Sequence, residues 1–248
     1  MALERTKISQ LTSVFPTGAA VFPIVQGGST VSCKLADMTT YLKDVSITSF
    51  AITPPTTTYE IGDNLTSLQL DWAFNKTPDQ ISLTLHDGSV QALSNDVITF
   101  TDSFSINSGT KTWKLSGTDF KSSASSTKTI RWVYPFFTGA STSNLTDGTG
   151  IYSSAEAGDL TKLVATKSNK TVNFNDTFLK YIYFAYPDDY PDLSKIRDQS
   201  DFDASDQFIK YEANITSTGL DNNYTQGYKI YSTYPNLVNA TGDYDFLF

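Results

Sequence analysis

The side chains best suited to chemistry are aspartates that gather in the last third of the chain. Seven of them lie between residues 188 and 206, namely Asp188, Asp189, Asp192, Asp198, Asp201, Asp203 and Asp206. A pair of carboxylates about 5–9.5 Å apart can hydrolyse a glycosidic bond in a sugar-binding cleft. Residues 201–206 could instead offer oxygen ligands to Ca²⁺, but the glycine and the distal glutamate of an EF-hand loop are missing. We therefore interpret the stretch as a solvated acidic loop.

Other groups for acid–base or nucleophilic catalysis are scarce. His86 is the one histidine and stands beside Asp87-Gly88, a hairpin signal, so we expect a solvated turn residue. Cys33 is the one cysteine, which excludes an intrachain disulfide, and we expect it to be a small buried side chain. The sequence therefore indicates no catalytic residue, no metal ligand set and no cofactor, and we predict that the protein is not an enzyme.

Three tyrosines in polar surroundings are candidates for contact with a ligand or a partner. Tyr190, Tyr224 and Tyr234 are expected to be exposed. Exposed tyrosine rings can stack on the sugar rings of a host glycan, but tyrosine is also common at protein interfaces. The sequence does not separate these two uses.

The acidic balance of the chain argues against nucleic acid as a partner. Its 248 residues hold 18 Lys and Arg against 26 Asp and Glu, a formal net charge of −8. Phosphate binding needs clustered Lys and Arg, and an acidic surface also disfavours an anionic membrane. No apolar stretch approaches the roughly 20 residues that span a bilayer. We expect no nucleic-acid binding and no membrane insertion.

Alternating apolar and polar residues predict an all-β fold with a first domain at residues 45–137. The expected strands are residues 45–52, 59–63, 65–74, 81–85, 97–100, 104–106, 110–115 and 127–134. About seven short strands in about ninety residues are typical of an immunoglobulin-like β-sandwich. Trp72, Trp113 and Trp132 fall on inward positions, so aromatic rings are expected to fill its core.

A second β-sandwich domain is predicted for residues 151–248. Residues 138–150 are polar and are interpreted as a linker or loop between the domains. The run 181–186 is apolar or aromatic at every position, which is typical of a central strand covered on both sides. The apolar residues 244–248 are expected to be packed rather than to hang free.

The first 44 residues predict a small arm. Residues 19–25 and 29–35 read as two short strands joined at Gly27-Gly28, and such a hairpin is too small to bury a core alone. Charged Glu4, Arg5 and Lys7 are followed by polar residues without a long apolar run, so we expect no export signal.

The arm resembles the N-terminal segment of many tailed-bacteriophage fibre, spike and appendage proteins. The matching residues are Ile8-Ser9-Gln10-Leu11, Thr17-Gly18, Pro23-Ile24-Val25-Gln26-Gly27-Gly28 and Leu35-Ala36-Asp37-Met38. In those proteins the segment commonly lies at the end that joins the virion. The resemblance implies that this arm docks to a neighbouring virion subunit through apolar contacts from Val21, Phe22, Ile24, Val25 and Leu35.

A second resemblance covers most of residues 45–235. Several phage virion proteins combine motifs that correspond here to Ile61-Gly62, Leu70-Asp71-Trp72-Ala73-Phe74-Asn75-Lys76-Thr77-Pro78, Tyr181-Ile182-Tyr183-Phe184-Ala185-Tyr186-Pro187 and Gly227-Tyr228-Lys229-Ile230-Tyr231. The chain departs from them at residues 134–139, where relatives often carry an aromatic-Tyr-Gly element.

Together the resemblances imply a structural protein of a tailed-phage virion, in its tail, neck or fibre-attachment apparatus. Other virion proteins are the expected partners, the chain is expected to form a homo-oligomer, and its expected location is the virion. The alternative is a carbohydrate-binding adhesin or receptor-binding module whose second domain grips a host glycan.

Overall fold

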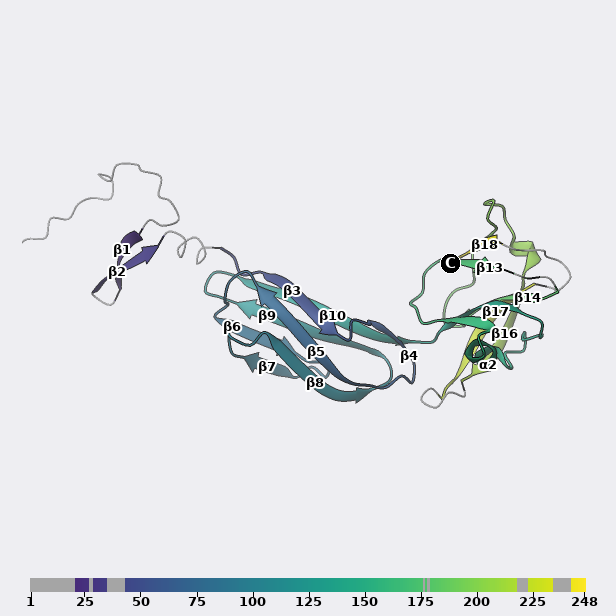
Figure 1. Cartoon of the computed structure of the whole chain (residues 1–248), viewed down its shortest axis with the longest axis horizontal. Coiled ribbons are helices and arrows are strands. Elements are labelled where there is room, and N and C mark those ends of the chain that lie inside the picture. Colours follow the sequence, from purple (N-terminus) through teal and green to yellow (C-terminus); the bar gives the residue numbers. More distant parts are fainter. Residues whose placement is uncertain are drawn as a thin grey trace, which may run out of the picture.

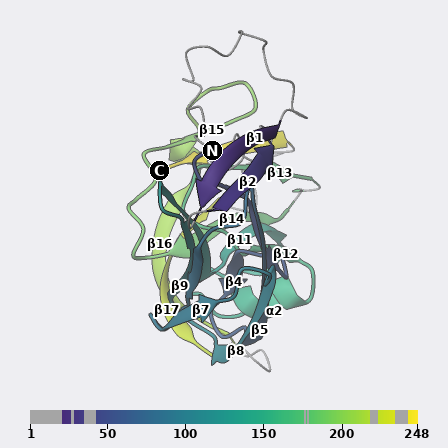
Figure 2. The same cartoon turned by 90° about the vertical axis from the view of Figure 1, so that its left-hand side faces the viewer.

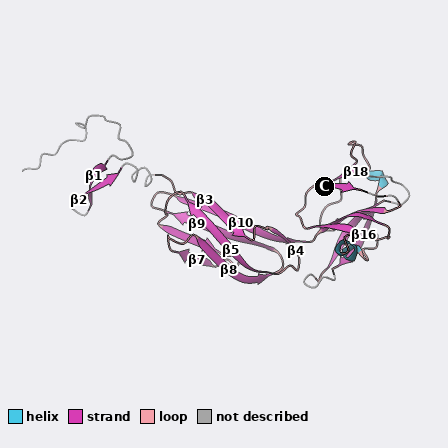
Figure 3. Cartoon of the chain, in the orientation of Figure 1, coloured by secondary structure: helices cyan, strands magenta, loops and turns pink. Residues whose placement is uncertain are grey.

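The computed structural model describes residues 21–26, 29–34, 43–175, 177, 179–217, 223–233 and 242–248, and for residues 21–34 it describes the backbone alone. Strands dominate this part of the chain, and α2 (Ile151–Glu156) is a short α-helix among them (Figure 3). The predicted all-β fold class is confirmed. In Figure 1 the two larger bodies follow one another along the long axis, and the N-terminal hairpin lies beyond the first of them.

The hairpin consists of β1 (Val21–Gln26) and β2 (Ser29–Lys34), which form a two-stranded antiparallel sheet. Its register pairs Phe22 with Cys33 and Ile24 with Val31. Because alternate positions of a strand share a face, these four positions lie on one face of the hairpin. Figure 2, which looks along the long axis, shows the hairpin in front of the rest of the chain.

The first body is a β-sandwich of eight strands. They are β3 (Ile47–Thr53), β4 (Thr58–Glu60), β5 (Leu65–Phe74), β6 (Gln80–Thr84), β7 (Val90–Leu93), β8 (Thr99–Ile106), β9 (Thr110–Thr118) and β10 (Ser123–Val133). One sheet has the order β3-β5-β8 and the other β4-β10-β9-β6-β7. Consecutive strands such as β5 and β6, or β8 and β9, lie in different sheets, and this division is that of an immunoglobulin-like sandwich.

Aromatic side chains fill this sandwich, as the inward alternation predicted. Trp113 is fully buried, and Trp72 and Trp132 are almost so. They pack with aliphatic side chains of both sheets, such as Leu68 and Leu83. Burial of a large apolar side chain stabilises a fold by about 1.5–3 kcal/mol, so a core of this kind can hold two sheets together without a disulfide.

Two strands of this domain differ from expectation. Residues 97–100 and 104–106 were expected as separate strands, but β8 begins at Thr99 and runs unbroken to Ile106. The polar residue Asp102 interrupts the apolar alternation in the sequence, yet its side chain is only 7% exposed and lies inside the domain. β7 was not predicted, because Val90 and the next two residues are exposed and show no alternation.

The second body consists of two sheets and the helix α2. Its strands are β11 (Phe136–Ser141), β12 (Leu160–Leu163), β13 (Lys170–Phe174), β14 (Tyr181–Pro187), β15 (Lys195–Arg197), β16 (Ile209–Thr216), β17 (Thr225–Ser232) and β18 (Gly242–Leu247), and η2 (Ser205–Gln207) is a 3₁₀ turn. The sheets have the orders β12-β11-β14-β17-β16 and β13-β18-β15.

Strand β14 lies at the centre of the larger sheet and is buried on both faces, as predicted. Phe184 on one face stacks on Phe246 of β18, with ring centroids 4.0 Å apart. Tyr183 on the other face belongs to the cluster that α2 covers. The predicted packing of the apolar residues 244–248 is also confirmed, because Phe246 is fully buried and β18 is the middle strand of the smaller sheet.

Residues 142–150 form a loop, but the interpretation of residues 138–150 as a linker between the domains is wrong. Their first residues belong to β11, which pairs with both β12 and β14 inside the larger sheet. Thr138 and Ser141 are buried polar residues of that strand, and Leu145 is buried beyond it. The polar composition suggested a loop, but these small polar side chains fit between bulky neighbours. The first sandwich therefore ends at β10, and the second begins at Phe136.

Candidate functional site

The junction between the two domains is very short. β10 ends at Val133 and β11 begins at Phe136, so only Tyr134 and Pro135 connect them. The hydroxyl of Tyr228 in the second domain donates a hydrogen bond of 3.0 Å to the Pro135 carbonyl oxygen. Proline fixes one backbone dihedral, and the bond ties the connection to β17. The connection has little freedom to bend.

A buried carboxylate from the first domain enters the second domain at this junction. Glu60, the last residue of β4, is 2% exposed. Its Oε1 accepts hydrogen bonds from the hydroxyls of Tyr152 (3.0 Å) and Tyr224 (3.1 Å). Its Oε2 lies 2.7 Å from the ammonium of Lys162. Three side chains from three segments of the second domain thus converge on one carboxylate of the first.

The electrostatics of this cluster favour its charged and hydrogen-bonded form. Burial alone would lower the pKa of Lys162, but the hydrogen bonds to Glu60 and Tyr152 raise it above its ordinary value. Burial, together with nearby Tyr228 and Glu60, raises the pKa of the Tyr224 hydroxyl. Lys162 therefore stays protonated and Tyr224 stays a neutral donor across the ordinary pH range.

Aromatic rings surround the carboxylate. Tyr224 meets Tyr134 edge-on, with ring centroids 5.0 Å apart, and meets Tyr152 at 6.2 Å with nearly perpendicular planes. The Lys162 ammonium lies 4.8 Å from the centre of the Tyr152 ring. Edge-to-face and cation–π contacts each contribute about 1 kcal/mol beyond burial. The arrangement is built to hold two domains in one orientation.

Two of the three tyrosines that the sequence predicts as exposed contact residues are described, and both differ from that expectation. Tyr224 is half-buried and donates to Glu60, so its hydroxyl is already used within the chain. Tyr190 is also half-buried, with its ring 5.7 Å from that of Phe136. Both rings complete aromatic clusters, a role that local sequence does not reveal. Tyr234 lies outside the described residues.

Several aspartates of the acidic stretch are held in ion pairs with basic side chains. Asp192 is held between the ammonium groups of Lys210 and Lys229, at 3.0 and 3.1 Å, which lower its pKa. Asp201 pairs with Arg197 at 2.6 Å. Within the described part of the chain, no group of three His, Cys, Asp or Glu residues is placed to hold a metal ion.

Two carboxylates of this stretch are used to shape turns. Asp198 accepts backbone N–H bonds from Ser200 and Phe202. Asp203 accepts one from Ser205, which together with Lys195 lowers its pKa. The stretch is not wholly a solvated loop, because β15 pairs with β18 inside it and Ile196 is buried, but its aspartates are used for structure.

His86 is not a solvated turn residue. Its Nδ1 lies 2.7 Å from Oδ2 of buried Asp102, and its ring packs against those of Phe104 and Trp113. Because a carboxylate only accepts hydrogen bonds, Nδ1 carries the hydrogen. The Trp113 indole N–H donates to the same oxygen at 2.8 Å. The turn signal Asp87-Gly88 located the turn, but it gave no information about which way the preceding imidazole points.

The expected anchoring residues are only partly described. Val21, Phe22, Ile24 and Val25 lie in β1, and Cys33 lies in β2. Leu35 lies outside the described residues. The predicted burial of Cys33 is not tested, because side chains are not described for residues 21–34.

Sequence reasoning missed the two charged residues of the junction, Glu60 and Lys162. A glutamate at the end of a short strand and a lysine in a polar segment give no local signal of pairing. Their contact can be recognised only once the fold brings β4 and β12 together.

Comparison with protein-family models finds no matching family, and comparison with curated proteins finds no significant relative. Among the described residues, no helix has the length and apolar character needed to cross a membrane.

Proposed function

We propose that the chain is a structural component of a tailed-phage virion, in its tail, neck or fibre-attachment apparatus. The N-terminal arm docks to a neighbouring subunit, and two β-sandwiches extend from it toward other virion proteins or the host surface. One observation carries this proposal most directly. The two sandwiches are joined by a two-residue connection and a buried carboxylate that three second-domain side chains bind. A rigid joint suits a protein that holds its neighbours at a fixed distance and orientation. It does not suit a protein whose domains close on a substrate.

The arm supplies the docking element of the proposal. β1 and β2 pair with each other, and their two-stranded sheet includes no other described strand. An isolated two-stranded hairpin is marginal in water, and its outer edges can add to a sheet of another chain. Apolar residues Phe22, Ile24 and Val31 share one face of the hairpin by register, which favours burial against a partner.

The docking role of this face can be tested by introducing charged residues into it in the full-length chain. Phe22→Asp with Ile24→Asp places two charges among the apolar positions, and Ser123→Asp with Ser125→Asp places the same charge on exposed positions of β10 in the first sandwich. We expect both chains to fold with the melting temperature of the wild type. The first is expected to fall at least about tenfold in particles purified by density gradient, because burying an unpaired charge at an interface costs several kcal/mol. The second is expected to be incorporated normally.

Removal of residues 1–44 is a coarser version of the same test. The remaining sandwiches are expected to fold and to be absent from particles. Normal incorporation of the Phe22 and Ile24 double variant and of the truncated chain would show that the arm is not the anchor.

A further inference from the structure

The three tryptophans of the chain differ in what their indole N–H groups bind. Trp113 donates to Asp102 at 2.8 Å, and Trp132 donates to the Asp63 carbonyl oxygen at 2.7 Å. The Trp72 ring is 4% exposed, and its Nε1 is buried without an acceptor among the described residues. Buried polar groups are nearly always hydrogen-bonded, and an unpaired one costs about 1–3 kcal/mol. The missing acceptor therefore points to something that binds beside Trp72.

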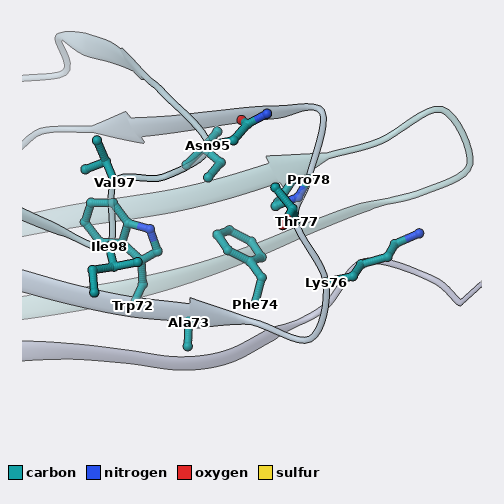
Figure 4. A pocket seen from close by; sticks show the side chains of 10 residues that line it. Trp72, Ala73, Phe74, Lys76, Thr77, Pro78, Asn95, Val97 and Ile98 are labelled. Atoms are coloured by element: carbon teal, nitrogen blue, oxygen red, sulfur yellow. The ribbon is translucent and has the colours of Figure 1, made fainter. Parts of the chain in front are cut away.

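A pocket of about 280 Å³ opens beside this ring, at the end of the first sandwich farther from the second domain. Figure 4 shows that the indole nitrogen lies on the side of the ring turned toward Phe74. Pro78, Val97 and Ile98 complete the apolar walls, and Ile98 is 66% exposed at the rim. Nε1 has almost no accessible surface of its own, so a ligand in the pocket reaches it when a side chain at the rim shifts. Apolar walls with a few polar groups are the common pattern of a small-ligand site.

The pocket follows from how the strands end. β8 pairs with β5 only as far as Thr99 opposite Asp71, and the Trp72 backbone N–H donates to the Ile98 carbonyl. Beyond that point the connection between β7 and β8 crosses from one sheet to the other and leaves a gap beside Phe74. Asn95 in this connection bonds the Asp79 carbonyl at 3.5 Å, which ties both sides of the opening together.

The lining indicates an uncharged ligand. Lys76 is the charged residue of the pocket wall, and its ammonium is paired with Asp119. The remaining polar groups are the amide of Asn95 and the hydroxyl of Thr77 near the rim. A matching ligand has an apolar face for Phe74 and oxygen atoms that accept from the indole N–H. The volume has room for about one ring.

We propose that this pocket binds one pyranose residue of a glycan, with a sugar oxygen accepting the hydrogen bond of Trp72 Nε1. A pyranose combines a face of C–H groups, which packs on aromatic and aliphatic walls, with oxygens that accept hydrogen bonds. The site is separate from the tyrosines Tyr190 and Tyr224, and it does not depend on where the protein is located.

The test follows the three indole N–H signals of the ¹⁵N-labelled full chain by NMR while methyl pyranosides of glucose, galactose, mannose and N-acetylglucosamine are added. Trp72→Phe, Trp113→Phe and Trp132→Phe assign the signals, because each variant removes one. We expect at least one pyranoside to move the Trp72 signal in a saturable way and to leave the Trp132 signal in place.

Trp72→Phe keeps an aromatic ring and removes the donor. It is expected to weaken binding by about tenfold, because one neutral hydrogen bond is lost. Trp132→Phe, which removes a donor at the opposite end of the sandwich, is expected to leave the affinity unchanged. Both replacements remove buried ring volume, but Trp72→Phe also removes an unpaired donor and Trp132→Phe an existing bond, so Trp132→Phe is expected to lower the melting temperature more.

N-acetyl-phenylalanine methylamide serves as a competing probe with an apolar ring and a carbonyl acceptor. If it moves the Trp72 signal and no pyranoside does, the pocket receives a protein side chain and the saccharide proposal is wrong. The proposal is also wrong if no pyranoside moves the signal at millimolar concentrations, or if Trp72→Phe binds as tightly as the wild type.

Discussion

Glu60 of the first sandwich accepts a hydrogen bond of 3.1 Å from the hydroxyl of Tyr224, 164 residues further along the chain. The carboxylate is almost fully buried, so it depends on its donors to replace water. Lys162 supplies the opposite charge at 2.7 Å. The relative orientation of the two domains is therefore fixed by a charged cluster, and not by the backbone connection alone.

Replacing Glu60 with alanine is expected to loosen the junction. The change leaves the Lys162 ammonium and two tyrosine hydroxyls without their acceptor and is expected to destabilise the chain by about 3 kcal/mol. The domains should also lose their fixed orientation, which small-angle X-ray scattering detects as a broader distribution of distances. Urea unfolding measures the stability.

Glu156→Gln is the matched control for this change. Glu156 also lies near Lys162, at 3.7 Å, but its side chain is about half exposed. A solvent-exposed ion pair contributes about 0–1 kcal/mol, so this variant is expected to behave like the wild type. If both variants were equally harmless, the buried carboxylate would not be what holds the domains.

A second buried carboxylate, Asp102, is expected to be essential to the first sandwich. Its Oδ2 accepts from both the His86 imidazole and the Trp113 indole. Asp102→Ala leaves two buried donors unpaired and is expected to cost about 3 kcal/mol in the free energy of unfolding. Asp71→Ala, on the adjacent strand with its carboxylate at the surface, should cost about 0.5 kcal/mol. Equal effects in urea denaturation would contradict the assignment.

The sequence predicts features of the fold that rest on local pattern. β5 was predicted with its bounds because Leu68, Leu70 and Trp72 alternate with polar residues, and all three are buried. β14 was predicted as central because every position is apolar or aromatic. These signals are local because the face that a side chain occupies is decided by strand periodicity.

The candidate site could not be predicted in the same way. Glu60 and Tyr224 acquire their roles only from partners far away in the chain, and an isolated tyrosine in a polar stretch looks exposed. Asp102 misled the strand assignment because the sequence cannot show that His86 and Trp113 satisfy a carboxylate inside the domain. Burial of polar groups depends on pairing, and pairing is a property of the complete fold.

The ion pair of Asp119 with Lys76 predicts a particular acid sensitivity. The hydrogen bond from Lys76 lowers the pKa of Asp119 from 3.8 to about 2. A carboxyl group whose pKa is lower in the folded state stabilises the fold above its unfolded pKa, and this contribution is lost as the pH falls through the folded value. Stability should therefore decline between about pH 4 and about pH 2.

Lys76→Met tests this dependence. Without the ammonium, Asp119 should titrate nearer to its ordinary pKa, so the variant is expected to be less stable at pH 7 and to show a shallower decline below pH 4. Urea unfolding of both chains at a series of pH values gives the two curves. Parallel curves across this window would mean that Lys76 does not set the titration of Asp119.

Gly148 and Gly158 offer a test of the revised assignment of residues 138–150. Both have left-handed backbone, with φ of 80° and 85°. At Gly158 the methyl group of an alanine would meet no atom within 4 Å, so the substitution costs only the strain of left-handed backbone, about 1 kcal/mol. At Gly148 the new methyl group would strike the backbone carbonyl of Asn214 in β16, which cannot rotate away as a side chain can.

Gly148→Ala is therefore expected to cost about 3 kcal/mol, roughly three times the effect of Gly158→Ala, when both are measured by urea unfolding. The additional destabilisation by Gly148→Ala, relative to Gly158→Ala, measures how tightly this segment packs on the larger sheet of the second domain. A true linker would move aside and show the strain alone. Equal effects of the two substitutions would restore the interpretation of residues 138–150 as a loop between domains, whereas a large excess supports a second sandwich that begins at β11.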